Sequence, residues 1–167
     1  MENEFLKELK TNLVAEYTHL WSDSLMRSTR YEFYRLFKLD WGQENYLIAL
    51  DKKVFRDVYV QFRTGFSELF THKYRYISDG HNNMLCPSCY ESDESEVHFL
   101  LECPVYKDLR DKYIGDVSYA VNEVVVQTLF NTNDVNSMRK VATFLYYALK
   151  RRSESVVIAM AEEAYYA

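Results

Sequence analysis

Apolar residues recur at helical spacing along the first half of the chain and predict a series of amphipathic helices. The first spans residues 4–26, and its apolar positions are Phe5, Leu9, Leu13, Tyr17, Leu20 and Leu25. A second helix begins near residue 28, and a short one follows the turn at 40–42. Over residues 52–70 the pattern predicts one longer helix, or two helices that join near Gly65.

The second half continues in the same way, with one ambiguous stretch. Residues 105–114 predict a helix. Residues 124–126 are three valines with strand propensity, but the apolar residues around them are spaced as in a helix, so we expect a helix. Asn133 or Asp134 caps the next helix, and Ser153 is expected to begin a last, separate segment.

The composition agrees with a mainly α, multi-helix domain. The chain has 167 residues, of which 48% are hydrophobic, and it contains only four glycines and two prolines. That apolar content is enough for a core, and the scarcity of turn-forming residues favours helices. We predict three parts, namely an N-terminal helical part with a basic and aromatic helix (1–84), a zinc knuckle with the helix that follows it (85–115), and C-terminal helices (116–167).

All three cysteines lie near one histidine, in the stretch CPSC-YESDESEV-H-FLLE-C. The spacing C-x2-C-x8-H-x4-C allows four side chains to reach one ion, and these are Cys86, Cys89, His98 and Cys103. Four nitrogen and sulfur ligands make a closed tetrahedral Zn²⁺ site, which is structural because no position is open for catalysis. The alternatives are a redox C-x-x-C pair and ordinary buried cysteines, but a thioredoxin-like pair would need a βαβ context.

Acidic residues fill the loop between the two halves of this cluster, and they are Glu91, Asp93, Glu94 and Glu96. Carboxylates compete poorly with thiolates for zinc, so we expect solvated surface acids. The alternative is that Glu94 or Glu96 accepts the second ring proton of a histidine near the metal. We expect His72 and His81 to be exposed and to have no specific role.

The cysteine count also bears on the compartment. Three cysteines cannot all pair within one chain, which favours metal ligation in a reducing, intracellular compartment, nuclear or cytoplasmic. The sequence has no run of about 18 apolar residues, and its N-terminus lacks the apolar block of a secretory signal. We therefore expect no membrane partner.

Four sequence blocks follow one another between Tyr34 and Ile114, and they are YRLFKLDWGQENYL, RDVYVQFRTGFSELFTHKYRY, CPSC and ESEVHFLLECPVYKDLRDKYI. Together they resemble the segment after the polymerase domain in non-LTR (LINE-type) retrotransposon reverse transcriptases. In that family the cysteine–histidine cluster looks like a zinc knuckle, and with the preceding basic helices it is implicated in holding template RNA or target DNA. The family's two arginines before the loop fall on Arg63 and Arg75, whereas His72 and Tyr74 depart from its usual acid and glycine.

The resemblance covers about half of the chain and leaves the polymerase itself out. The sequence has no aromatic-x-Asp-Asp pair to hold two magnesium ions and no endonuclease carboxylate set. We therefore expect a binding module and not an enzyme.

The basic and aromatic stretch from Lys52 to Tyr76 is the predicted nucleic-acid surface. It holds six bases and two acids among tyrosines, a pattern that suits phosphate neutralisation and base stacking. The predicted contacts to RNA or single-stranded DNA are Lys52, Lys53, Arg56, Arg63, Lys73, Arg75 and Tyr76. A second, less weighted basic cluster is Arg139, Lys140, Lys150, Arg151 and Arg152.

The net charge of −5 is unusual for a nucleic-acid-binding domain and supports an alternative. In that alternative the chain is a protein-interaction or architectural zinc module without nucleic-acid binding. Its partner would be a protein such as a polymerase body, which would contact the aromatic residues Tyr31, Tyr34, Trp41 and Tyr46.

Overall fold

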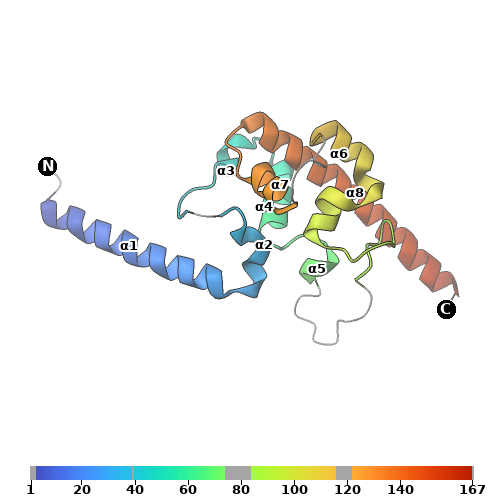
Figure 1. Cartoon of the computed structure of the whole chain (residues 1–167), viewed down its shortest axis with the longest axis horizontal. Helices are drawn as coiled ribbons and strands as arrows, with labels where there is room; N and C mark the ends of the chain where they lie inside the picture. Colours follow the sequence, from blue (N-terminus) through green and yellow to red (C-terminus); the bar gives the residue numbers. More distant parts are fainter. Residues whose placement is uncertain (1–2, 39, 74–83, 116–121, 167) are drawn as a thin grey trace.

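Figure 1 shows a computed structural model of the chain, which describes residues 3–38, 40–73, 84–115 and 122–166. Its elements, in chain order, are α1 (Glu4–Arg27), η1 (Thr29–Tyr31), α2 (Glu32–Arg35), α3 (Tyr46–Ala49), α4 (Lys53–Arg63), α5 (Phe70–Lys73), η2 (His98–Glu102), η3 (Pro104–Tyr106), α6 (Lys107–Tyr113), α7 (Asn122–Phe130) and α8 (Val135–Tyr166). The predicted mainly α, multi-helix fold is confirmed.

The centre of the fold is the packed pair α4 and α8. α8 also contacts α3, α6 and α7, and Figure 1 shows it running across the molecule. Phenylalanines from α2, η2 and α7 pack around Phe62 of α4. The ring of Phe62 lies 5.5, 5.7 and 5.9 Å from those of Phe33, Phe99 and Phe130. Aromatic pairs at such separations are favourable, so this cluster joins distant parts of the chain.

Over residues 52–70 the pattern forms one helix, α4, because the next helix, α5, begins only at Phe70 and not directly after Gly65. α4 ends at Arg63, and Gly65 takes a left-handed conformation with φ of 71°. The Gly65 amide donates to the Phe62 carbonyl at 3.3 Å, and the Phe66 amide donates to the Gln61 carbonyl at 2.8 Å. This pair of bonds is a Schellman motif, which ends a helix where glycine is available.

The C-terminal helices match the sequence analysis except at Ser153. The three valines at 124–126 are helical, within α7, and the Asp134 carboxylate caps α8 by accepting from the Ser137 amide at 2.7 Å. The expectation that Ser153 begins a separate segment is wrong, because α8 continues through it. The Ser153 hydroxyl donates to the Leu149 carbonyl of the preceding turn at 3.0 Å. The helix therefore satisfies this side chain without being interrupted.

One buried cluster within the described residues draws on all three predicted parts. Phe62, Cys103 and Phe144 come from the first, second and third part, and all three are fully buried. The division at residues 84 and 115 stays a prediction. Among the described residues, no helix combines the length and the apolar content that crossing a bilayer requires.

Candidate metal centre

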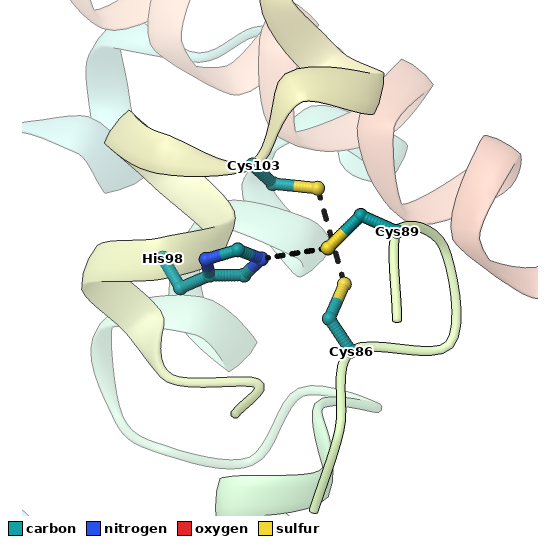
Figure 2. A group of neighbouring side chains, drawn as sticks. All are labelled: Cys86, Cys89, His98 and Cys103. Atoms are coloured by element: carbon teal, nitrogen blue, oxygen red, sulfur yellow. Dashed lines mark hydrogen bonds between the residues drawn. The ribbon is translucent and has the colours of Figure 1, made fainter. Parts of the chain in front are cut away.

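Cys86 and Cys89 lie in a tight backbone knuckle that precedes η2. The Cys86 amide donates to the Ser92 carbonyl at 2.8 Å, and the Glu94 amide donates to the Met84 carbonyl at 2.7 Å. Between these bonds the chain reverses, and Tyr90 takes a φ of 57° while its amide donates back to the Cys86 carbonyl at 2.9 Å. The knuckle is thus closed by its own backbone, and both C-x-x-C sulfurs are on its inner side (Figure 2).

His98 and Cys103 are brought together by an unusual helical turn. η2 is a π-helical turn, and the Cys103 amide donates to the His98 carbonyl at 2.7 Å. A bond from residue i+5 to residue i gives a wider turn than an α-helix, and such turns are frequent at functional sites. The spacing H-x4-C therefore matches the geometry of this turn, because His98 and Cys103 are the acceptor and donor residues of one π-helical hydrogen bond.

The four predicted ligands converge, as Figure 2 shows, and they can hold a metal ion. One ligand atom from each lies within 4.8 Å of all the others. The sulfurs of Cys86 and Cys103 are 3.9 Å apart, and the Cys89 sulfur is 3.3 Å from Nε2 of His98. A tetrahedral zinc with bonds of about 2.3 Å to sulfur and 2.0 Å to nitrogen needs ligand separations of roughly 3.5–3.8 Å. The two measured separations lie just above and just below that range, so small side-chain adjustments would complete a tetrahedral site.

The electrostatics of the two buried cysteines also suit a cation. A hydrogen bond from Cys103 lowers the pKa of the Cys86 thiol to about 4, while the same bond and burial raise the pKa of the Cys103 thiol. The two sulfurs are thus joined by one S–H···S hydrogen bond of 3.9 Å. Metal binding replaces that proton, because thiolates are the form that ligates.

Comparison with models of protein families, with curated proteins and with solved structures gives no match. The resemblance to the non-LTR reverse transcriptases therefore stays a prediction from the residues.

Arg110 is a partner of the site that the sequence analysis missed. Its guanidinium is 7% exposed and donates to the Cys103 carbonyl at 2.7 Å. Burial lowers the pKa of Arg110, and the nearby Cys103 sulfur raises it again. A site with three thiolates and one divalent ion has a formal charge of −1, so a buried guanidinium beside it supplies compensating charge. Nothing in the spacing of α6 residues indicates this role.

The expectation that Glu94 is a solvated surface acid is wrong. Its side chain is fully buried and accepts two bonds from Arg152 of α8, at 2.5 Å from Nε and 2.7 Å from an end nitrogen. It also accepts from the Phe70 amide at the start of α5 at 2.6 Å. Glu94 thus ties the knuckle to two helices at once. Glu91 and Asp93 are exposed, as expected.

The expectation that His72 is exposed is also wrong. Its ring is buried, with Nδ1 accepting from the Ser67 hydroxyl at 2.7 Å and Nε2 donating to Glu96 at 2.8 Å. Glu96 therefore contacts a histidine, but this is not the ligand histidine. The second ring nitrogen of His98 lies 3.9 Å from Glu102 instead. His81 lies outside the described residues.

Arg63 is not available as a nucleic-acid contact, and that prediction is corrected. It is 3% exposed and donates to the Phe130 carbonyl at 2.8 Å and to Glu44 at 3.0 Å. The guanidinium also lies 4.5 Å from the ring centre of Phe37. Arg63 is a buried cation that joins α4 to the end of α7 through these contacts.

The other predicted nucleic-acid contacts are partly accessible. Lys52 and Lys53 are exposed, and Lys53 is 2.5 Å from Asp57. Arg56 donates to the carbonyls of Leu50 and Asp51, and Lys73 pairs with Glu68. Arg75 and Tyr76 lie outside the described residues. The predicted surface is therefore smaller than expected, and it centres on the two lysines.

The aromatic surface of the alternative prediction is also reduced. Tyr46 is buried, Tyr31 and Tyr34 are half-buried, and Trp41 is 48% exposed. In the second basic cluster, Arg152 forms a buried ion pair with Glu94, and Arg151 pairs with Asp108 at 2.6 Å. Large exposed apolar side chains occur on several elements, and α1 carries the longest series of them, from Phe5 to Leu20.

Proposed function

We propose that Cys86, Cys89, His98 and Cys103 hold one structural Zn²⁺ ion. The observation that supports this proposal is the set of ligand separations, which suit a closed tetrahedral S₃N site. Soft thiolate and imidazole ligands select zinc over magnesium or calcium. Free cysteines as ligands also fit a reducing compartment, nuclear or cytoplasmic.

Metal analysis and cobalt substitution test this proposal. Protein purified without added metal should contain one equivalent of zinc, and Co²⁺ in its place should give the absorption of a tetrahedral thiolate site. Co²⁺ bound in octahedral geometry, or no stoichiometric metal, would contradict it.

We further propose that the chain is a non-catalytic, zinc-stabilised protein-interaction module whose contact surface is α1. The supporting observation is the exposure of the apolar side of this helix, where Leu6, Leu13 and Tyr17 are 51%, 56% and 61% exposed. Apolar patches of that kind on a folded domain mark binding surfaces. A polar substitution on this side should abolish partner binding and leave the zinc content unchanged.

Nucleic-acid binding is the second candidate. The observation that favours it is the position of Arg139 at the start of α8, 3.7 Å from Asp51, which places a base of the second cluster beside exposed Lys52 and Lys53. Bases from α4 and α8 thus share one end of the central helix pair. Phosphate contacts there would make affinity fall with salt.

An RNA titration distinguishes the two candidates. Labelled single-stranded RNA is titrated at low and moderate salt against the wild type and against Lys52→Ala plus Lys53→Ala. Salt-sensitive binding that the double substitution weakens supports the second candidate, and no binding at low salt contradicts it. Arg63→Ala is unsuitable for this test, because it leaves Glu44 without its buried partner.

A further inference from the structure

Most of α1 projects from the rest of the molecule (Figure 1), and its large apolar side chains from Phe5 to Leu20 are exposed. We define the α1 stripe as the five residues Leu6, Leu9, Leu13, Tyr17 and Leu20, which are 44–61% exposed. Their spacing of three or four residues puts them on one side of the helix. Within the helix, only Leu25 is buried.

The contacts of α1 with the body are confined to its C-terminal part. The ring of Trp21 lies 5.7 Å and that of Tyr17 5.2 Å from the ring of Trp41, and Lys38 lies over Trp21. The helix otherwise contacts η1 and α2, which follow it directly. An isolated helix of about 12–15 residues is marginal in water, since most helical stability comes from packing of the apolar side. We therefore expect the N-terminal part of α1, which does not contact the body, to be stabilised by a partner that packs against the stripe.

The stripe has the same spacing when it is read from either end. The steps from Leu6 to Leu20 are three, four, four and three residues, so the stripe is symmetric about Leu13. A two-fold axis through Leu13 would place two copies of α1 antiparallel. Leu13 would then meet Leu13 of the second copy, Leu9 would meet Tyr17, and Leu6 would meet Leu20. Such an interface is isologous, because each copy offers the same surface to the other.

Area and charge are both compatible with this pairing. The five residues of the α1 stripe are 44–61% exposed. With about 100 Å² for each half-exposed side chain, they offer roughly 500 Å² per copy, which is below the ~800 Å² per partner of a standard interface and suits a weak, transient one. α1 carries four acids and three bases, so its charge opposes self-association little.

We propose that the partner of the α1 stripe is a second copy of this chain, bound as an antiparallel helix pair centred on Leu13. This inference rests on the proposed protein-interaction function, and it names the partner. The area is that of a weak, transient interface, so the dimer is expected to dissociate in the micromolar range or above.

Sedimentation equilibrium of the full, zinc-loaded chain tests the pairing. Between about 1 µM and about 500 µM the mass should rise from 19.9 kDa towards twice that value. Leu13→Asp should weaken the association at least about 100-fold, because it buries two like charges at the axis. The matched control is Thr11→Asp, which adds the same charge at an exposed position on the opposite side of α1 and should leave the mass curve unchanged. A dimer that persists in Leu13→Asp overturns the proposal.

Mild oxidation of introduced cysteines tests the orientation. A mixture of Leu6→Cys and Leu20→Cys proteins should give the mixed disulfide, whereas Leu6→Cys alone should not cross-link efficiently. Wild-type protein under the same conditions reports any reaction of Cys86, Cys89 or Cys103. Efficient cross-linking of Leu6→Cys to itself would indicate parallel helices and would overturn the antiparallel pair.

An apolar fluorescent dye such as anilinonaphthalene sulfonate separates failure of this inference from failure of the proposed function. A wild type that stays monomeric but binds the dye through Leu13 retains a contact surface, so the partner would be another protein and only the self-association is overturned. A monomer whose dye binding is the same in wild type and Leu13→Asp has no such surface, and both proposals then fail. Zinc content, measured in parallel, confirms that each variant remains folded around its metal.

Discussion

The metal centre and α1 both have a clear sequence pattern, but the first is buried in the structure and the second is almost entirely exposed. Around the metal centre, Phe99, Leu100 and Tyr106 are completely buried although η2 and η3 are only five and three residues long. α1 has 24 residues and an evident apolar periodicity, yet it buries only Leu25. Of these two regions, the one with the shorter helical elements contributes to the core.

The difference shows that periodicity predicts which side of a helix is apolar but not what covers it. Elements as short as η2, η3 and the seven-residue α6 cannot persist alone. They are held by interactions across the chain, namely the contacts within the cysteine–histidine cluster, the Glu94–Arg152 pair and the packing of Phe99. We therefore expect substitutions at the metal centre to cost far more stability than equivalent substitutions on α1.

The largest effect should come from removing a metal ligand. Cys103→Ser leaves an incomplete site, and structural zinc contributes its binding free energy directly to folding, so we expect a loss of more than about 5 kcal/mol. Circular dichroism and urea unfolding in the presence of zinc would show a partly unfolded chain. The control is His98→Cys, which keeps four ligands and should remain folded with zinc bound. A Cys103→Ser protein that melts like the wild type would refute the structural role.

The next effect concerns the buried ion pair that ties the knuckle to α8. Glu94→Gln leaves the Arg152 guanidinium, whose side chain is 4% exposed, without a counter-charge. An uncompensated buried charge costs about 3–5 kcal/mol, which denaturant unfolding at saturating zinc would measure. Glu91→Gln is the matched control, because Glu91 is an exposed acid of the same loop and should change stability by less than about 0.5 kcal/mol. Equal effects of the two substitutions would contradict the burial of Glu94.

Local patterns made much of the fold and of the metal site predictable. The first helix, the break at Gly65 and the helical state of residues 124–126 follow from spacing and from a glycine within a few positions. The four ligands were also predictable, because the cluster lies within 18 consecutive residues and the ligand types are specific. The wrong boundary at Ser153 has a local cause, because a serine hydroxyl can bond to a carbonyl of the helix that contains it.

The partners of charged residues could not be predicted, because they lie far apart in the sequence. Glu94 and Arg152 are 58 positions apart, and Arg63 reaches the Phe130 carbonyl across 67 positions. Buried and exposed charges look alike in a local pattern, so the pattern predicts a phosphate contact at Arg63 and a surface acid at Glu94. The sequence also does not show whether an apolar stripe, such as that of α1, is covered by its own chain.

The same substitution in both regions tests the comparison directly. Leu100 is fully buried beside the metal ligands, and Leu13 is 56% exposed on α1. Leu100→Ala should destabilise the protein by about 2–4 kcal/mol through lost burial and a cavity. Leu13→Ala should cost less than about 0.5 kcal/mol when it is measured at low protein concentration, where the chain is monomeric. Similar losses from both variants would mean that α1 packs against the body more than its exposure indicates.

The smallest effect is expected at the Asp108–Arg151 pair, which links α6 to α8 on the surface. Arg151 donates to both Asp108 oxygens, at 2.6 and 2.9 Å, and this pairing lowers the pKa of Asp108 to about 2. The Asp108 side chain is 64% exposed, so solvent screens the pair and Asp108→Asn should cost at most about 0.5 kcal/mol. A carboxyl with a lowered folded-state pKa stabilises above the unfolded-state value of 3.8 and loses its contribution only as pH falls towards 2. Thermal unfolding at pH 5, 6.5 and 8, all above that window, should therefore show the same small difference between the wild type and Asp108→Asn at each pH. The local control is Asp111→Asn, which removes the pair with Lys107 within α6 and should show an equally small difference. A cost that grows steeply from pH 8 to pH 5 would mean that Asp108 titrates in that range and is not held by Arg151.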